Sequence, residues 1–352
     1  MYTYDFHKNY ALSLPKSSYI KKGLCGLANQ GNTCFMNSVL QCLSNTLKLT
    51  DYFLSNRFKD DDPEQLNKRK MEYYLVMSYC NFLVNVWDTN QILRPKSFFE
   101  NLAKFKPKYF KLQQQDSHEC LMFILELLHK GLSYEITVDI KGTVENKTDE
   151  LMKMSFTQFK NYYQKEYSYI IETFYGMFLN TINCSNCDQN DHVFEPYNCL
   201  QLELSESIQA CLQRSFGTPE TVSTWKCEKC KKTGCKKQTE IWTPPSCLII
   251  HFKRFKNSGA KDDTHVQFPL DDLDLTPFVS PIKKDMNNYL YSCYAINFHS
   301  GDTQGGHYWS ACKNMNGHWY MFNDSNVSKI SDENVLYKNA YMLFYHRKMI
   351  VE

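Results

Sequence analysis

Two matched cysteine pairs constrain the folding of this 352-residue chain more than any other feature. Cys184 and Cys187 form the first pair, and Cys227 and Cys230 form the second. Two intervening residues let both sulfurs of a pair face one ion, so the pairs supply the four thiolates of a tetrahedral structural zinc site. Because the long stretch 188–226 separates the pairs, the ion would join the ends of an extended β excursion. Four protein ligands leave no open position, so we expect a structural role for this metal.

Two other interpretations of these cysteines stay open. The four could be free thiols on two turns, although two matched pairs seldom arise by accident. They could also hold a nucleic-acid-binding finger, but basic residues surround only the second pair and are equally typical of a solvated face. These residues are Lys226, Lys229, Lys231, Lys232, Lys236 and Lys237.

The overall composition excludes several classes of protein. The net charge is only +2. Dedicated nucleic-acid-binding or membrane-surface proteins carry a larger excess of basic residues, so the charge argues against both classes. No apolar run approaches the roughly 20 residues that span a bilayer, and residues 1–20 lack the apolar segment of a signal peptide. We therefore expect an intracellular protein, with cytoplasm and nucleus not distinguished. In that setting, free thiols, metal ligands and a reactive cysteine explain the fifteen cysteines better than disulfides do.

The chain changes from helical to strand-like patterning near residue 169. After a polar lead-in over residues 1–22, apolar residues recur at helical spacing through residues 34–132. Residues 138–166 are polar and weakly patterned, and we expect an excursion or mobile loop there. Helices first and strands second predict an α+β fold with two lobes. The predicted strands cover residues 170–179, 197–204, 247–255, 289–299, 308–313, 319–323 and 340–346.

A polar run before the apolar segment 120–128 marks the start of one buried helix. Asp116, followed three residues later by Glu119, resembles a capping box. We therefore expect Asp116 to cap this helix.

A possible nucleophile lies at the start of the helical half. Residues 26–43 form a loop rich in glycine and asparagine that becomes a helix at or near Cys34. A cysteine in the first helical turn sits beside unsatisfied N–H groups and the positive end of the helix dipole, which favour the nucleophilic thiolate. Upstream, Asn29 could donate its amide to a developing oxyanion. A buried structural cysteine stays an open alternative, because cysteines in apolar runs are commonly buried.

A thiol nucleophile needs a histidine that takes its proton and later protonates the leaving amine. His307 follows the glycine-containing loop 301–306 and precedes a predicted strand that would fix its position. Its orienting partner would be an amide or carboxylate, and Asn323 ends the neighbouring predicted strand. His299 and His318 stay rivals for this role. A purely structural role for His307 also stays open, because a lone histidine near a strand end is usually structural.

Taken together, these motifs resemble the ubiquitin-specific protease family, the papain-like deubiquitinases. The resemblance runs from about residue 23 to residue 347 and rests on six motifs in the family's order. They are the cysteine box around Cys34, the Gln-Gln-Asp box at 114–119, Phe174-Tyr175-Gly176 leading to Cys184, the palm strand at 248–255, and the two parts of the histidine box at 305–308 and 319–327.

The resemblance implies a papain-like fold with a helical thumb, a β palm and zinc-clipped β fingers. Residues 23–352 would then be a single catalytic domain. Within it, residues 23–135 would form the thumb, about 168–245 the fingers and about 246–350 the palm. The implied cofactor is a structural Zn²⁺ ion.

The resemblance also implies roles for individual residues. Cys34 would be the nucleophile and His307 the base, Asn323 would take the third triad position, Asp324 would support it, and Asn29 would donate to the oxyanion. The residues expected to contact ubiquitin are Asp116, Gln114, Gly305, Gly306 and Tyr308.

The implied activity is hydrolysis of the isopeptide bond after ubiquitin's C-terminal glycine, through a Cys-His-Asn triad and a thioester. The implied partners are ubiquitin and ubiquitinated proteins, without direct nucleic-acid or membrane binding. Two alternatives are a non-catalytic ubiquitin-binding scaffold of the same fold and a protease for another ubiquitin-like modifier.

Overall fold

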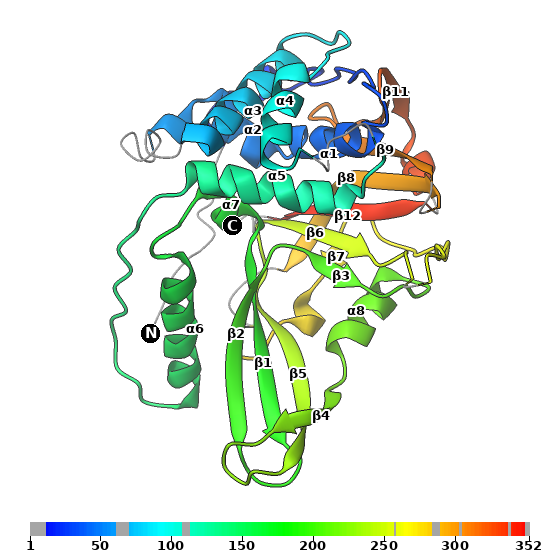
Figure 1. The fold of residues 1–352 in the computed structure, drawn as a ribbon. Coiled ribbons are helices and arrows are strands. Elements are labelled where there is room, and N and C mark those ends of the chain that lie inside the picture. Colours follow the sequence, from blue (N-terminus) through cyan, green and yellow to red (C-terminus); the bar gives the residue numbers. More distant parts are fainter. Residues whose placement is uncertain are drawn as a thin grey trace.

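A helical region packs against a large sheet, and a narrower sheet projects away from both (Figure 1). The computed structural model describes residues 12–60, 70–107, 113–256, 258–283, 289–302, 305–336 and 339–348. Residues 1–11 of the predicted lead-in lie outside these ranges. The mixture of helices and sheets in separate regions confirms the predicted α+β class.

The helical region occupies the part of the chain in which helical spacing predicts it. Its helices bury apolar residues at that spacing, among them Val39, Leu83 and Ile124, which are all fully buried. The helices are α1 (Cys34–Ser44), α2 (Leu47–Leu54), α3 (Lys70–Asp88), α4 (Lys96–Phe105), α5 (Ser117–Leu132) and, further along the chain, α7 (Tyr169–Phe174).

The predicted cap of α5 is present. Asp116 has an extended backbone conformation, and its Oδ1 accepts a hydrogen bond of 2.9 Å from the Glu119 N–H. This bond satisfies one of the orphan donors in the first helical turn. The Glu119 carboxylate also lies 3.4 Å from the Lys106 ammonium, which joins the start of α5 to the segment after α4.

The large sheet has the strand order β11-β10-β9-β8-β12-β6-β3, with β7 also paired to β8. All its pairs are antiparallel except β3 with β6. Five predicted strands are confirmed as β6, β8, β9, β10 and β12, whereas the predicted strand 197–204 shrinks to β3. The bounds are β3 (Leu200–Leu202), β6 (Cys247–Phe252), β7 (Leu273–Asp274), β8 (Leu290–Gly301), β9 (Gly306–Lys313), β10 (Trp319–Asn323), β11 (Asn326–Ile330) and β12 (Ala340–Arg347).

The projecting sheet has the order β2-β1-β5-β4 and begins directly after α7. The predicted strand 170–179 is therefore wrong in its first half. Ser168 caps a short helix there, because its side chain accepts from the Ile171 N–H. The strands are β1 (Gly176–Cys184), β2 (Asn190–Tyr197), β4 (Glu220–Lys226) and β5 (Thr233–Thr243), and α8 (Ile208–Phe216) precedes β4.

The expected loop over residues 138–166 is also corrected. Most of it forms the helix α6 (Lys147–Tyr163), which lies beside the projecting sheet (Figure 1). Asn146 caps α6 by accepting from the Asp149 N–H. The buried face of α6 carries Met152, Phe159 and Tyr163, whose helical spacing is diluted by many polar residues. Its apolar signal was therefore too weak to predict the helix.

The described part of the lead-in is packed into the fold. Tyr19 is fully buried, and its hydroxyl donates to Asp51 on α2 across 2.6 Å. The N–H groups of Ser13 and Leu14 also donate to the Asp51 carboxylate, at 2.9 and 3.0 Å. Arg57 lies 3.7 Å from it and offsets part of its charge. One buried carboxylate therefore ties residues 13–19 to the helical region.

Replacement of Asp51 tests this attachment. Asp51→Ala leaves three donors without their acceptor, so we expect the free energy of unfolding to fall by about 3 kcal/mol. Tyr19→Phe removes one hydrogen bond and should cost about 1 kcal/mol. Urea unfolding followed by circular dichroism measures both values. Equal losses in the two variants would contradict the role given to Asp51.

Candidate active site and metal centre

Cys34 is the first residue of α1 and is only 2% exposed. The loop before it turns at Gly31 and Asn32, whose φ angles are +93° and +55°. Glycine and asparagine tolerate this left-handed region better than other residues do. Beyond Cys34, α1 packs against β9 and β8 of the large sheet. The loop therefore places the thiol where the helical region meets the sheet.

The sheet brings His307 and Asn323 together. In the pairing of β9 with β10, Phe322 lies opposite Ser310. Extending this register by one residue places Asn323 diagonally across from His307 on the same face. Nε2 of His307 lies 2.7 Å from Oδ1 of Asn323. Because an amide oxygen only accepts, Nε2 carries the proton of this bond and Nδ1 is left for another partner.

That second partner is the Cys34 side chain. Its hydrogen bond is the largest of the influences that raise the pKa of His307 to about 9. The Asn323 bond and the negative charge of Asp324 raise the pKa further, while burial lowers it. A histidine with an ordinary pKa of about 6.5 is mostly neutral at pH 8, whereas His307 remains an imidazolium there. The site thus favours a positive ring beside the sulfur.

The two rival histidines lie elsewhere. His299 is 2% exposed and lies against Tyr308, with the two rings tilted by 40° and their centroids 4.4 Å apart. Burial lowers the pKa of His299 to about 4. His318 is exposed in the turn between β9 and β10, at the opposite end of β9 from His307.

The Asp324 carboxylate links the β10–β11 turn to the loop before α1. Asp324 adopts a left-handed conformation with φ of +49°. Its Oδ2 accepts from Asn29 Nδ2 at 2.9 Å, and its Oδ1 accepts from Asn37 Nδ2 at 2.7 Å. Its backbone oxygen also accepts from the Leu27 N–H at 2.8 Å.

Asn29 is held from both ends of its side chain. Its Oδ1 accepts from the N–H groups of Gly31 and Thr33, at 3.0 and 3.2 Å. One hydrogen of its Nδ2 is used by Asp324, which leaves the second for another acceptor. The amide orientation at the predicted oxyanion position is therefore fixed.

Asn37 is a site residue that sequence reasoning missed. It lies in the predicted cysteine box, one helical turn after Cys34, and is 2% exposed. Its Nδ2 donates to Asp324 and to the Leu27 carbonyl. A polar amide at i+3 from the thiol, on the same side of the helix as Cys34, was the available signal.

Two of the predicted ubiquitin contacts bind each other. Gln114 Nε2 donates to the Gly306 carbonyl at 2.5 Å, and the Gly306 N–H donates back to Gln114 Oε1 at 2.7 Å. A Cβ at position 306 would lie 2.3 Å from Nε2 of His299, so only glycine fits there. Gly305 is exposed, and an added Cβ there would meet nothing within 4 Å.

Asp116 and Tyr308 lie deeper than these glycines. Oδ2 of Asp116 accepts from the Tyr341 hydroxyl, so the same carboxylate caps α5 and anchors β12. Tyr308 is only 5% exposed and packs edge-on against Tyr341, with ring centroids 5.8 Å apart. Most of the Tyr308 ring is therefore covered by the protein itself.

A cavity of about 210 Å³ opens beside the loop that carries Cys34. It lies between this loop and α4. Its lining residues include Gln30, Thr33, Phe35, Phe99, Ala103 and Gln113.

The four paired cysteines come together at the far end of the projecting sheet. Cys184 ends β1, and Cys227 directly follows β4. The Sγ atoms of Cys184 and Cys230 lie 3.7 Å apart, as do those of Cys187 and Cys227. All four Sγ atoms lie within 4.8 Å of one another. The predicted union of two distant pairs is confirmed, and residues 188–226 form the excursion between them.

The spacing of the sulfurs fits a tetrahedral ion. With metal–sulfur bonds of about 2.3 Å, the edge of such a tetrahedron is about 3.8 Å, close to the two observed separations. An ion pair of 2.6 Å between Lys229 and Asp188 connects the two turns outside the cluster. The cluster is therefore placed to hold one metal ion.

Comparison with known proteins identifies the family. The family model described as ubiquitin carboxyl-terminal hydrolase matches residues 25–345. The chain belongs to the ubiquitin carboxyl-terminal hydrolase family. The resemblance inferred from the sequence motifs is thereby confirmed.

Two relatives named ubiquitin carboxyl-terminal hydrolase 2 illustrate the match. The human protein is 34% identical over 342 residues, which cover 92% of this chain and 55% of the human protein. The chicken protein is 34% identical over 350 residues, which cover 94% of this chain and 95% of the chicken protein. This chain thus spans about half the length of the human relative.

Solved structures share the fold. A SAGA DUB module of Ubp8, Sgf11, Sus1 and Sgf73 bound to monoubiquitin matches with a TM-score of 0.75 and 24% identity, over 98% of this chain and 72% of that one. The same module bound to ubiquitin aldehyde matches with a TM-score of 0.73 and 26% identity, over 95% of this chain and 71% of that one.

None of the helices in the described ranges is both long and apolar enough to cross a membrane.

The charge of His307 gives a direct test of the site geometry. Cys34→Ala removes the hydrogen bond that contributes most to its raised pKa, so the pKa should fall from about 9 toward the ordinary value of about 6.5. Asn323→Ala should lower it by less. An NMR titration of the imidazole measures these values, with Cys42→Ala, a buried cysteine later in α1, as the matched control. A His307 pKa that is the same in Cys34→Ala and in the unmodified protein would exclude the contact.

Proposed function

We propose that this chain is a thiol-dependent deubiquitinase that hydrolyses the isopeptide bond after the C-terminal glycine of ubiquitin. One observation carries the proposal: the His307 ring bonds to the Asn323 amide oxygen on one side and to the Cys34 side chain on the other. The family membership and the names of the relatives support the same activity. The ubiquitin-bound modules of similar fold support ubiquitin as the partner.

The proposed division of the chain follows the two sheets. Residues 23–352 form one catalytic domain, with the thumb over 23–135, the fingers over about 168–245 and the palm over about 246–350. The helices α1 to α5 support the thumb, and the sheet β2-β1-β5-β4 supports the fingers. The large sheet, which carries His307 and Asn323, supports the palm.

The first step forms a thioester. The Cys34 thiolate attacks the terminal glycine carbonyl, a carbon–sulfur bond forms, and the electron pair of the carbonyl moves to its oxygen. The free amide hydrogen of Asn29 and the N–H groups of the first turn of α1 stabilise this oxyanion. The tetrahedral intermediate collapses as the carbon–nitrogen bond breaks, and the His307 imidazolium gives its proton to the lysine nitrogen.

The second step releases ubiquitin. Neutral His307 now takes a proton from water, and the resulting hydroxide attacks the thioester carbonyl. The carbon–sulfur bond breaks, the Cys34 thiolate returns, and ubiquitin leaves with a free carboxylate. The Asn323 oxygen keeps the ring oriented throughout, and Asp324 holds Asn29 in place.

The proposed binding residues surround the approach to Cys34. Gln114, Gly305 and Gly306 contact the extended diglycine tail, where larger residues would not pass. Because Gln114 and Gly306 bond to each other in the free chain, the tail has to exchange these two hydrogen bonds. Asp116 and Tyr308 support the next part of the tail from beneath.

The proposed metal is Zn²⁺, held by the four clustered cysteines. When bound, it supplies folding free energy to the fingers and no reacting group, because four thiolates fill a tetrahedral shell. We further propose an intracellular location, where free cysteines stay reduced.

Substitutions in the triad test the catalytic assignment. Cys34→Ala should abolish hydrolysis of ubiquitin conjugates while fluorescence anisotropy still detects ubiquitin binding. Asn323→Ala should lower kcat by about 10²-fold with a smaller change in KM, because it misorients His307 without removing it. Hydrolysis by Cys34→Ala near the unmodified rate would refute the nucleophile. Binding of ubiquitin without any turnover by the unmodified chain would instead indicate a scaffold. Faster turnover of conjugates of another ubiquitin-like modifier would assign that modifier, and not ubiquitin, as the substrate.

The metal assignment has its own test. Cys227→Ser should lower the zinc content and expose the finger sheet to hydrogen exchange, because three thiolates bind zinc less tightly. Cys235→Ser is the matched control: Cys235 is buried beside Cys184 in the sheet but is not in the cluster. If elemental analysis finds no zinc in the unmodified protein, the assignment of Zn²⁺ to the four cysteines is refuted.

A further inference from the structure

A fully buried asparagine lies where the large sheet meets α1 and α5. Asn297 is in β8, between Ile296 and Phe298, and all three residues are 0% exposed. Burial of an amide costs free energy unless protein groups replace its hydrogen bonds to water. An apolar side chain would fill the same space without that cost. The amide at this position therefore points to a role for its polar atoms.

The two ends of the Asn297 amide bond to two different helices. Its Nδ2 donates to the Ser38 hydroxyl of α1 at 2.8 Å. Its Oδ1 accepts from the hydroxyl of Ser117, the first residue of α5, at 2.9 Å. Ser38 and Ser117 are 2% and 0% exposed, so water does not compete for these two bonds. A single side chain of the sheet thus bridges α1 and α5.

On the α1 side, the bridge leads to the thiol. Ser38 lies one helical turn after Cys34, and its hydroxyl donates to the Phe35 carbonyl at 3.0 Å. Because a hydroxyl has one hydrogen, and the Phe35 carbonyl takes it, Ser38 can only accept from Asn297. The bridge therefore attaches the first turn of α1, which begins at Cys34, to the sheet.

On the α5 side, the bridge leads to two residues proposed to support the ubiquitin tail. Ser117 directly follows Asp116 and also forms hydrogen bonds with Tyr308. Burial, and after it the charge of Asp116, raises the pKa of the Tyr308 hydroxyl above its ordinary value, and the bonds with Ser117 oppose part of this rise. Ser117 thus connects Asn297 to the surface beneath the tail.

We propose that Asn297 is a positioning residue that holds α1 and α5 at a fixed spacing, so that the Cys34 thiol and the ubiquitin tail meet in line. This role rests on the proposed function, and Asn297 itself is fully buried and does not touch the substrate. The two ends of its amide have separate effects. The bond to Ser38 holds the thiol beside His307 and sets the rate of bond cleavage, whereas the bond to Ser117 sets the affinity for the tail.

Steady-state hydrolysis of ubiquitin linked to a C-terminal fluorescent amine separates these two effects. Ser38→Ala should lower kcat about tenfold with little change in KM, and Ser117→Ala should raise KM about tenfold with little change in kcat. Asn297→Leu has the same branching of side-chain atoms but loses both bonds, so it should do both. Adding either serine substitution to Asn297→Leu should change the kinetics no further, because the bonds are already lost.

An NMR titration of His307 gives a second readout, which needs no ubiquitin. Ser38→Ala and Asn297→Leu should lower its pKa from about 9 toward the ordinary value of about 6.5, because the thiol moves away from the ring. Ser117→Ala should leave the pKa unchanged. The titration can be read even if the chain hydrolyses no ubiquitin conjugate, so failure of the positioning role is distinct from failure of the proposed activity.

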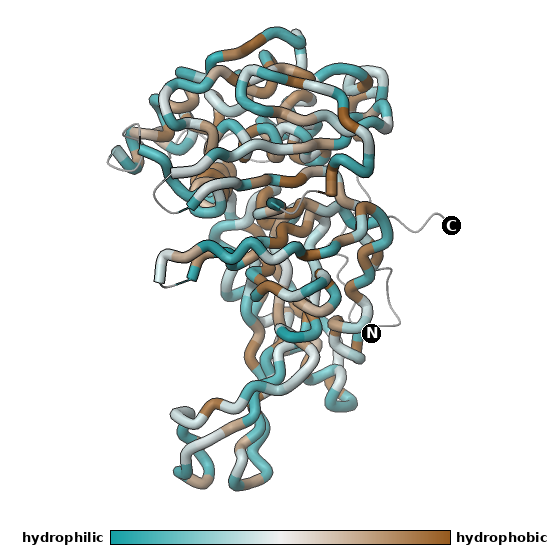
Figure 2. Tube along the Cα trace, turned by 90° about the vertical axis from the view of Figure 1, so that its right-hand side faces the viewer, coloured by the Kyte–Doolittle hydropathy of each residue, from teal (hydrophilic) through white to brown (hydrophobic). Residues whose placement is uncertain are grey.

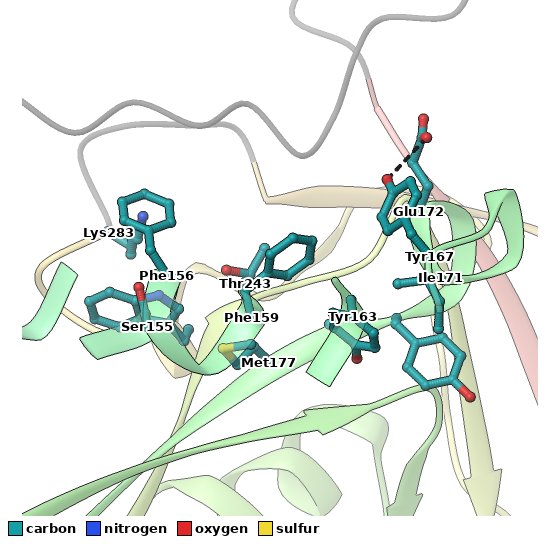
Figure 3. A pocket seen from close by; sticks show the side chains of 13 residues that line it. Ser155, Phe156, Phe159, Tyr163, Tyr167, Ile171, Glu172, Met177, Thr243 and Lys283 are labelled. Atoms are coloured by element: carbon teal, nitrogen blue, oxygen red, sulfur yellow. Dashed lines mark hydrogen bonds between the residues drawn. The ribbon is translucent and has the colours of Figure 1, made fainter. Parts of the chain in front are cut away.

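A buried serine of α6 is the matched control for Ser38. Ser155 lines a small pocket between α6 and the projecting sheet, away from Cys34 (Figure 3). It is 5% exposed, and its hydroxyl donates to the carbonyl three residues earlier, at 2.8 Å, as that of Ser38 does. Ser155→Ala should leave kcat and the pKa of His307 unchanged.

A buried asparagine of β1 is the matched control for Asn297. Asn180 is 2% exposed, donates to Glu195 at 2.6 Å and accepts from Thr239 at 2.7 Å. Asn180→Leu should lower the melting temperature as Asn297→Leu does, because each loses two buried hydrogen bonds. It should leave kcat and the pKa of His307 unchanged.

Three outcomes would overturn the proposal. They are unchanged kinetics in a folded Asn297→Leu variant, the same change of kcat and KM in Ser38→Ala and Ser117→Ala, or a loss of kcat in the two controls equal to that in the variants they match. The last outcome would indicate general destabilisation only. Thermal unfolding verifies that each variant folds, and the two serine variants carry the test if Asn297→Leu does not fold.

Discussion

The Asp324 carboxylate joins the two halves of the site, which are far apart in the sequence. It lies in the turn of a hairpin in the large sheet, and it accepts from Asn29 before α1 and from Asn37 within α1. The view in Figure 2, turned by 90° from Figure 1, shows the helical region and the large sheet stacked above the projecting sheet. The position of Asn29 relative to Cys34, and of His307 relative to both, depends on this junction.

The junction explains how one neutral amide suffices as the hydrogen-bond partner of the histidine ring. Asn323 orients the His307 ring by one hydrogen bond, and the charge of Asp324 reaches the ring from one residue further along. A single carboxylate thus fixes the amide of Asn29, the proposed oxyanion donor, and also favours the imidazolium. In the proposed mechanism this arrangement replaces a carboxylate in direct contact with the ring.

Much of this arrangement was readable from the sequence because it rests on local rules. The start of α1 at Cys34, the cap at Asp116 and the strands around His307 follow from spacing, capping and alternation. The spacing of the cysteine pairs predicted their cluster, because metal ligands recur at characteristic spacings in a sequence. These features need no knowledge of distant contacts.

Other features depend on tertiary contacts and escaped prediction. α6 is too polar to be recognised until the projecting sheet covers its apolar face. β4 and β5 are largely polar or exposed strands, held by pairing with their neighbours rather than by an alternating pattern. The role of Asn37 became visible only when folding brought the β10–β11 turn against α1. The bond between Gln114 and Gly306 likewise spans the two regions of the molecule.

One measurement tests the central claim most directly. The chain is mixed with ubiquitin that carries a C-terminal electrophile, and the modified peptide is mapped by mass spectrometry. The account expects a single adduct on Cys34, formed faster than alkylation by a small electrophile of equal reactivity, and lost when His307 is replaced by alanine. An adduct on another of the fifteen cysteines, or none from a chain that binds ubiquitin, would contradict it.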